Sequence, residues 1–259
     1  HARHRELVAA IQARPGVTAR ILGATVEGRE MDLLEIGSGP LNLWFIGRQH
    51  PGETQASWWM EGFLRRLTDP DDALARSLRE RATFNVVPHM NPDGGVLGNL
   101  RTNAAGANLN REWQEPSAER SPEVFHVRAR MEQTGVDFLL DVHGDEGLPY
   151  NFIAGPQGIS GYDLRFLDLS DRFCASYQHV NPDFQTEHGY PPVAVGKADL
   201  RICTKYVAST FQCLAMTLEQ PFKDSAITPE PVAGWSPGRC AHLGASVLDA
   251  LAAVIGDLR

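Results

Sequence analysis

The 259-residue chain contains few cysteines and no closely spaced pair of them. None of its 4 cysteines forms a C-x-x-C pair with another. A chain of this length does not need disulfides to complete its core, so we expect reduced, packed thiols.

Excess positive charge and long apolar runs are absent too. The formal net charge is -8 at pH 7, which argues against nucleic acid as a partner. No apolar stretch reaches the roughly 20 residues of a membrane-spanning helix, and no signal peptide is visible. We therefore expect no membrane partner and a cytoplasmic location, although a first residue of His1 rather than Met indicates a missing amino-terminal segment.

No repeat, low-complexity tract or charge block divides the chain, which predicts a single domain.

Short apolar runs alternate with helical patterns along the chain. Strands are predicted at Leu41–Gly47, Thr83–Pro88, Phe138–Val142 and Leu214–Glu219, after a hairpin over Thr18–Ile36. Helices are predicted at Arg5–Ala13, Thr54–Leu67, Asp71–Arg81, Pro122–Thr134, Tyr162–Tyr177 and Pro237–Leu258. This alternation predicts an α/β fold with a mixed, mostly parallel central sheet flanked by helices. The final helix, apolar at steps of four, is expected to pack in the core.

Three segments indicate a zinc hydrolase. His50 and Glu53 lie in the segment His-Pro-Gly-Glu just after one predicted strand, His143 ends a second, and Glu219 ends a third. Side chains at the carboxyl ends of neighbouring strands collect at one edge of an open α/β sheet. Two imidazoles and one carboxylate hold a catalytic zinc with an open position for water, and a separate carboxylate serves as the base.

Each of these residues taken alone has a plainer interpretation. A histidine three residues before a glutamate is common by chance, and a single histidine at a strand end is more often structural. The spacing also differs from H-E-x-x-H, where the glutamate between the histidines is the base. Here Glu53 would be a ligand, so the base must come from elsewhere, and the hypothesis depends on all three segments together.

A long loop rich in Gly and Asn separates the proposed metal segments. Loops of this length inside a compact domain are usually functional or disordered. The loop carries Arg101 and Arg111, and the guanidinium group offers a fixed fork of donors that suits a carboxylate or an oxyanion. The alternative is that both arginines are solvated or pair with acidic side chains.

Six ordered motifs between about Leu22 and Phe222 together resemble the zinc metallocarboxypeptidase family. The subgroup is that of the cytosolic carboxypeptidases, which are deglutamylase-like, and in particular its bacterial members. The motifs are His50-Pro51-Gly52-Glu53-Thr54, Asn91-Pro92-Asp93-Gly94, Gly98-Asn99-Leu100-Arg101, Leu109-Asn110-Arg111-Glu112-Trp113, Asp141-Val142-His143-Gly144 and Thr217-Leu218-Glu219-Gln220-Pro221-Phe222.

The resemblance implies a role for each matching residue. It implies that His50, Glu53 and His143 bind one zinc ion, and that Glu219 is the general base that later protonates the leaving amine. Arg101 matches the arginine that stabilises the tetrahedral oxyanion.

Asn110 and Arg111 match the pair that binds the free α-carboxylate of the substrate. Peptide or protein carboxyl termini are therefore the expected partners.

The chain departs from the family pattern at two places, and these departures limit how far the roles of the family's residues can be assigned to it. The family often has aspartate two residues before the Asn-Arg pair, where it accepts a hydrogen bond from a zinc-bound histidine, but this chain has Asn108. An amide can still accept that bond with less charge. A mobile catalytic tyrosine is also common in the family, and both Tyr190 and Tyr206 are candidates for it, each with a structural role as the alternative.

Basic residues precede Glu219, where the family builds its side-chain pocket. They are Lys197, Arg201 and Lys205. A basic pocket would select an acidic terminal residue such as Glu through charge and hydrogen bonding. An amphipathic helix over residues 199–213 with a solvated basic face explains the same pattern equally well.

These observations predict a zinc carboxypeptidase that removes a carboxyl-terminal, acidic residue. Residues 1–259 are expected to be the peptidase catalytic domain, and the resemblance to bacterial members implies that a small β-sandwich domain precedes it. One alternative is a zinc amidohydrolase of the same fold that acts on small N-acyl amino acids, as aspartoacylases and desuccinylases do. Another is a non-catalytic peptide-binding module, although such a module would not need Glu219 or Arg101.

Overall fold

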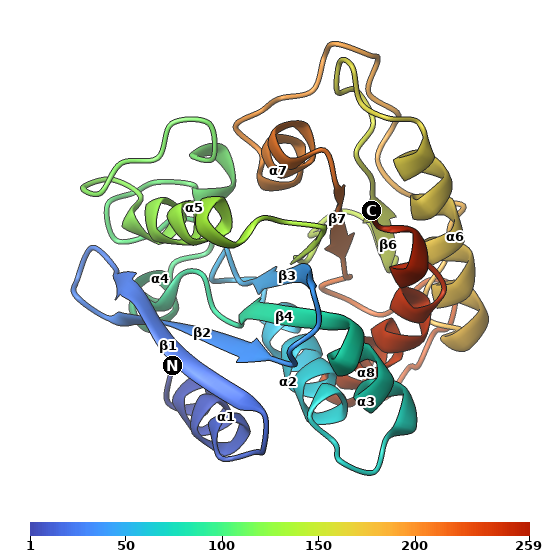
Figure 1. Cartoon of the computed structure of the whole chain (residues 1–259), viewed down its shortest axis with the longest axis horizontal. Coiled ribbons are helices and arrows are strands. Elements are labelled where there is room, and N and C mark those ends of the chain that lie inside the picture. The colour runs from blue at the N-terminus through green and yellow to red at the C-terminus, as the bar shows by residue number, and fades with distance from the viewer.

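The computed structural model describes all residues, 1–259, and is built around one seven-stranded sheet (Figure 1). Its strand order is β1-β2-β4-β3-β5-β7-β6. The four central strands β4, β3, β5 and β7 run parallel, whereas β1, β2 and β6 add antiparallel pairs at the two edges. The strands are β1 Val17–Ala24, β2 Glu30–Ile36, β3 Leu41–Gly47, β4 Ala82–Val87, β5 Phe138–Val142, β6 Phe152–Ala154 and β7 Leu214–Glu219. The predicted mixed, mostly parallel sheet is confirmed.

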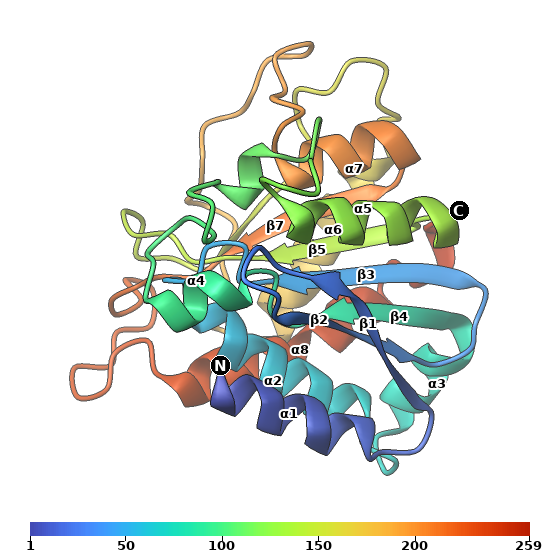
Figure 2. The same ribbon diagram turned by 90° about the vertical axis from the view of Figure 1, so that its left-hand side faces the viewer.

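Helices cover both faces of the sheet (Figure 2). Helices α5 and α7 lie on one face, and α1, α2, α3 and α8 lie on the other, where α6 also packs against α8. The helices are α1 Ala2–Gln12, α2 Gln55–Leu67, α3 Ala73–Arg81, α4 Pro92–Leu97, α5 Pro122–Thr134, α6 Arg165–Val180, α7 Cys203–Phe211 and α8 Pro237–Ala252. None of the helices combines the length and the apolar composition that a membrane crossing requires.

Strand β3 shows why the central strands are mostly apolar and do not alternate with polar residues. Leu43 and Phe45 point into the larger core under α2 and α8, and Trp44 and Ile46 point into the smaller core under α5 and α7. Successive side chains of a strand face opposite sides of the sheet, and both sides here are covered. Burial on both faces therefore fixes the register of β3 against its neighbours.

Helix α2 is held very close to α8. A Cβ atom built on Gly244 of α8 would lie 2.0 Å from the carbonyl oxygen of Trp59 in α2, so only glycine permits this approach. Helix α2 begins at Gln55, two residues after Glu53. The close contact between these helices thus anchors the loop that carries two of the proposed metal ligands.

Most predicted elements are confirmed, with differences at their ends. The strands predicted at Leu41–Gly47, Phe138–Val142 and Leu214–Glu219 have the observed bounds. The helix predicted from Thr54 begins one residue later, at Gln55, and Thr54 lies at its N-cap position without a side-chain capping hydrogen bond. The last helix ends at Ala252, and a 3-10 turn over Ile255–Asp257 replaces its predicted end.

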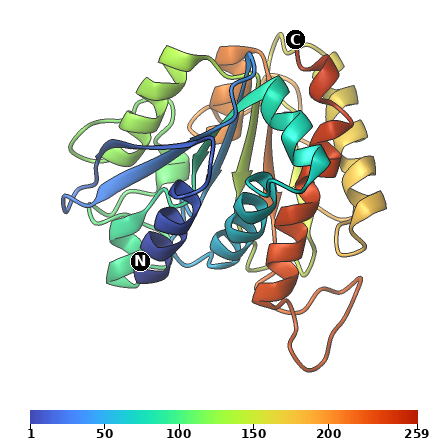
Figure 3. The same cartoon turned by 60° about the horizontal axis from the view of Figure 1, so that its bottom comes forward.

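Two short elements, α4 and β6, were not predicted, because six and three residues are too few to show a period. The segment between β7 and α8 extends from the body of the protein (Figure 3).

Candidate active site

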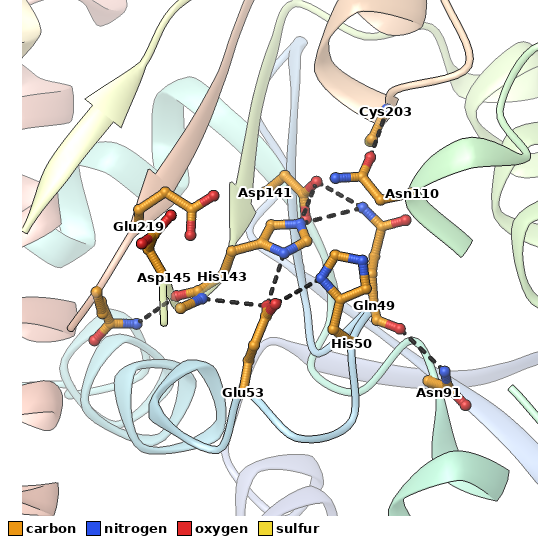
Figure 4. Close-up of polar contacts among 12 residues, drawn as sticks. Gln49, His50, Glu53, Asn91, Asn110, Asp141, His143, Asp145, Cys203 and Glu219 are labelled. Atoms are coloured by element: carbon orange, nitrogen blue, oxygen red, sulfur yellow. Dashed lines mark hydrogen bonds and ion pairs between the residues drawn. The ribbon is translucent and has the colours of Figure 1, made fainter. Parts of the chain in front are cut away.

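His50, Glu53 and His143 meet at the carboxyl ends of β3 and β5 (Figure 4). These two strands are adjacent and parallel, so the loops that follow them lie side by side. The Nδ1 atom of His50 lies 2.6 Å from one oxygen of Glu53, and Nδ1 of His143 lies 2.8 Å from the other. One ligand atom from each residue lies within 4.8 Å of the others. The predicted ligands therefore converge on one point.

The donor set fits zinc. All three side chains are buried, with 3%, 5% and 2% exposure for His50, Glu53 and His143. Burial opposes the charge on Glu53, but the adjacent imidazoles of His143 and His50 lower the pKa of its carboxyl to about 2. Two ring nitrogens and one ionised carboxylate are the ligands of a catalytic zinc that keeps one position open.

The loop that carries His50 has its own anchor in Arg48. This residue adopts a left-handed backbone conformation with φ 61, which turns the chain sharply out of β3. Its guanidinium donates to the hydroxyl of Ser57 at 2.6 Å and also to the carbonyl of Pro51. These bonds close the turn between His50 and Glu53.

Each imidazole has an acceptor on its outer nitrogen. Nε2 of His50 lies 2.9 Å from Oδ1 of Asn108, and the same oxygen accepts the backbone N–H of Asn110, which orients it toward the ring. Nε2 of His143 lies 2.9 Å from Oδ2 of Asp141. Acceptors at these positions leave Nδ1 of both rings for the metal side. Asn108 thus occupies the place where the family often has aspartate, and Asp141 was not predicted as part of the site.

Glu219 lies beside this triad at the end of β7. Its side chain is buried, and Oε2 has no hydrogen-bond partner. Burial, together with the nearby carboxylates of Glu53 and Asp145, raises the pKa of Glu219 to about 8. A buried carboxyl group with one free oxygen beside a metal triad is suited to exchanging a proton with a water molecule.

Tyr190 is the tyrosine that reaches the site. Its hydroxyl contacts Oδ2 of Asp145 and lies 3.1 Å from Oε1 of Glu219. Burial and these two carboxylates raise the pKa of its phenol. Tyr206 instead lies on α7 under the guanidinium of Arg128, 4.7 Å from the ring centroid, and does not line the cavity. Asp145 was not predicted, and its position two residues after His143 was the available signal.

A cavity of about 1200 Å³ joins these residues to the predicted substrate-binding residues. Arg101, Asn110 and Arg111 line it together with the metal triad and Glu219. Oδ1 of Asn110 accepts the backbone N–H of Cys203 at 2.9 Å, which turns the amide donors of Asn110 away from that backbone. Burial and the charge of Arg101 lower the pKa of Arg111, as expected for two cations in one cavity.

Lys205 is the only one of the three predicted basic residues that lines the cavity. Its ammonium group donates to the carbonyl oxygens of Gly155 and Gln157, and burial lowers its pKa to about 8. Arg201 is exposed outside the cavity and pairs with Asp199 at 2.8 Å. The expected basic pocket therefore contains one lysine and not a cluster.

A buried triad of two histidines and a glutamate at the carboxyl edge of a parallel sheet, with a second buried glutamate beside it, defines a metal-dependent hydrolase site. A family model described as zinc carboxypeptidase matches residues 4–153. The chain belongs to this family of metallocarboxypeptidases, whose cofactor is zinc.

Similar proteins come from bacteria and from animals. The chain is 49% identical over 256 residues to an uncharacterized protein of Zymomonas mobilis, covering 99% of this chain and 67% of that protein. It is 34% identical over 148 residues to mouse cytosolic carboxypeptidase 6, covering 52% of this chain but only 27% of the mouse enzyme.

Among solved structures, a metallo-carboxypeptidase of Pseudomonas aeruginosa in complex with (2-guanidinoethylmercapto)succinic acid superposes with a TM-score of 0.97 at 46% identity, over 100% of this chain and 70% of that chain. The chain thus spans about two thirds of these bacterial relatives.

Proposed function

We propose that residues 1–259 form the catalytic domain of an exopeptidase that removes the carboxyl-terminal residue of a peptide, with an acidic residue such as Glu preferred. The observation that carries the proposal is the single cavity that unites the metal triad, the buried carboxyl of Glu219 and two arginines. The bacterial relatives are longer than this chain by about a third of their own length, and we propose that the additional part contains the small β-sandwich domain. Similarity to the cytosolic carboxypeptidases supports a cytoplasmic location.

His50, Glu53 and His143 would hold the metal in this proposal. Bound zinc supplies a Lewis acid that lowers the pKa of a coordinated water to about 7. Glu219 accepts the proton of the attacking water on its free Oε2 and donates a proton to the leaving amine. Positive charge beside Glu219 favours its ionised form, so the carboxyl is a base when the site is loaded.

Two groups of donors would hold the substrate. Arg101 stabilises the negative charge that develops on the scissile carbonyl oxygen, since a guanidinium is a strong donor to an oxyanion. Asn110 and Arg111 bind the terminal α-carboxylate through the amide N–H groups and the second guanidinium. A free α-carboxylate is required by this arrangement, which is why the activity is that of an exopeptidase.

The preference for an acidic terminal residue rests on Lys205. Its ammonium group lines the cavity and, with a pKa of about 8, is charged at neutral pH. The carbonyl partners of Lys205 fix its position without neutralising its charge. One half-buried cation is enough to favour a carboxylate over an apolar side chain, because hydrogen bonds to charged groups contribute about 1.5 to 3 kcal/mol.

A cavity of this size favours a peptide over a small N-acyl amino acid. Its volume of about 1200 Å³ exceeds that of an ordinary small-molecule site of roughly 300 to 1,000 Å³. This difference supports the carboxypeptidase over the amidohydrolase.

The test is release of free amino acids from peptides ending in Glu, Asp, Lys or Leu and from polyglutamate, using zinc-loaded protein with Glu219→Gln as the control. Preferential glutamate release that the control lacks supports both parts of the proposal. Equal or faster release of Lys or Leu contradicts the acidic preference alone. No release from any peptide, with hydrolysis of N-acyl amino acids instead, contradicts the exopeptidase.

A further inference from the structure

Gln49, the residue before His50, lies at the centre of a buried chain of hydrogen bonds behind the metal triad (Figure 4). Its side chain is fully buried, with 0% exposure. Its amide oxygen accepts the indole N–H of Trp113 at 2.9 Å, and its amide nitrogen donates to Oδ2 of Asp141 at 2.6 Å. The backbone carbonyl of Gln49 accepts the amide of Asn91 at 3.0 Å.

The chemistry of the two neighbours fixes the orientation of this amide. An indole N–H can only donate, and an ionised carboxylate can only accept. The oxygen of Gln49 must therefore face Trp113, and its nitrogen must face Asp141. The same Oδ2 of Asp141 accepts Nε2–H of His143 at 2.9 Å, so the chain Trp113–Gln49–Asp141–His143 has one consistent direction.

The direction of these hydrogen bonds determines which ring nitrogen of the metal ligand His143 carries the proton. A neutral imidazole carries its proton on one of two nitrogens, and the hydrogen bond made by one nitrogen decides which one is free to bind a metal. With the proton of His143 on Nε2, the lone pair of Nδ1 points toward Glu53. Removing the amide of Gln49 would take away one of the two hydrogen bonds to Oδ2 of Asp141 and loosen this carboxylate, because its Oδ1 has no hydrogen-bond partner.

Gln49 also connects three chain segments that supply the site. It lies two residues after β3 and next to His50. It reaches the end of β5 through Asp141, and it reaches the 3-10 segment Leu109–Arg111 through the nearby Trp113. That third segment follows Asn108, the acceptor for His50. One buried amide thus lies between the elements that orient both imidazoles.

We propose that Gln49 is a positioning residue that holds Asp141, and through it His143, in the orientation and tautomer that bind the metal. The inference rests on the metal site of the proposed function but not on its substrate. Outer hydrogen-bond partners of metal ligands typically change metal affinity by about 10- to 100-fold when they are lost. Gln49 acts mainly through Asp141, since its amide nitrogen lies 2.6 Å from Asp141 but 3.5 Å from Nε2 of His143, so we expect a loss near the lower end of this range.

The experiment measures the zinc dissociation constant by competition with a chromophoric chelator and the stability of the metal-free protein by urea unfolding. Gln49→Met keeps the length of the side chain and removes the amide. Trp113→Phe removes the indole donor at the start of the chain, together with part of a buried ring, and serves as a second variant that leaves Gln49 in place. Asn181→Leu is the matched control, because Asn181 is a fully buried amide bonded to Ser246 and lies in the contact between α6 and α8, away from the metal triad.

We expect Gln49→Met to weaken zinc binding about tenfold and Trp113→Phe to weaken it less, with the double variant no worse than Gln49→Met alone. Asn181→Leu should lower the unfolding midpoint and leave zinc affinity unchanged.

Wild-type zinc affinity in Gln49→Met, or equal losses in all variants including Asn181→Leu, would overturn the inference. If wild-type protein binds zinc but cleaves no peptide while the pattern above holds, the proposed function fails and this inference stands.

Discussion

Substitution of Glu123 by glutamine should change how stability depends on pH. Glu123 lies in the first turn of α5 with 0% exposure. One of its oxygens accepts the amide of Asn103 at 3.0 Å, and the other has no partner. Burial, together with the charge of Asp93, raises the pKa of its carboxyl to about 7, and its hydrogen bonds oppose the rise only in part. Glutamine keeps the acceptor for Asn103 and cannot ionise.

The sign and size of the effect follow from these two pKa values. The ordinary value of 4.5 applies to the unfolded chain, so the folded protein holds its proton about 2.5 pH units longer. At about 1.4 kcal/mol per unit this amounts to roughly 3 kcal/mol. The contribution is complete below pH 4.5 and is lost as the pH rises through 7. Relative to Glu123→Gln, the wild-type protein should therefore become less stable by about 3 kcal/mol between pH 4.5 and pH 8.

Urea unfolding of metal-free wild-type and Glu123→Gln protein at pH 5, 6, 7 and 8 measures this difference directly. All other titrating groups are shared by the two proteins, so they cancel in the comparison. The two curves of unfolding free energy against pH should diverge between about pH 5 and pH 7 and then run parallel up to pH 8, because Glu123 is then ionised in both the folded and the unfolded chain. Curves that are parallel over the whole range would refute the argument, since they would mean that Glu123 ionises equally easily in the folded and unfolded chain.

Three further substitutions test the site and the core. Arg101→Met should lower kcat about 10²- to 10³-fold with little change in KM, as expected for loss of an oxyanion donor, and a loss confined to KM would contradict that role. Lys205→Met should lower kcat/KM for Glu-terminated peptides about 10- to 100-fold while sparing Leu-terminated ones, measured with matched peptides, and equal losses would dismiss charge selection. Gly244→Ala should cost about 1 to 3 kcal/mol in urea unfolding because its Cβ meets the carbonyl of Trp59 at 2.0 Å. Its control is Gly238→Ala, where the nearest atom is 3.9 Å away, and equal effects of the two would refute the packing argument.

A feature can be predicted from the sequence when it depends on residues that are close together in the chain, and not when it depends on how distant segments pack. Strands β3, β5 and β7 are buried on both faces, so their sequences are largely apolar runs with clear ends. The convergence of His50 with His143 could be predicted because both follow such runs. The partners of these rings could not, since the bond from Gln49 to Asp141 spans 92 residues and depends on how the loops pack.

The positions of the residues around the substrate cavity could not be predicted from the sequence either, for the same reason. Lys205 and Arg201 both precede Glu219, but their orientation depends on where α7 begins and how it is rotated, and Arg201 is held outside by Asp199. Tyr190 reaches Glu219 from an irregular segment that has no period to predict its course. Sequence patterns therefore gave the metal centre more completely than the residues that surround a substrate.

The register of the central strands ties the site to the core. Gly47 is paired with Val142, and Val142 with Leu218, so the residues that follow these strands start at one level. The backbone N–H of His143 continues the ladder to the carbonyl of Leu218 at 2.8 Å, which places His143 beside Glu219. A slip of one residue would turn every core side chain of β5 to the wrong face and would separate the imidazole from the base in the same step. The apolar packing that stabilises the sheet is thus also what fixes the distance between the metal ligands and Glu219.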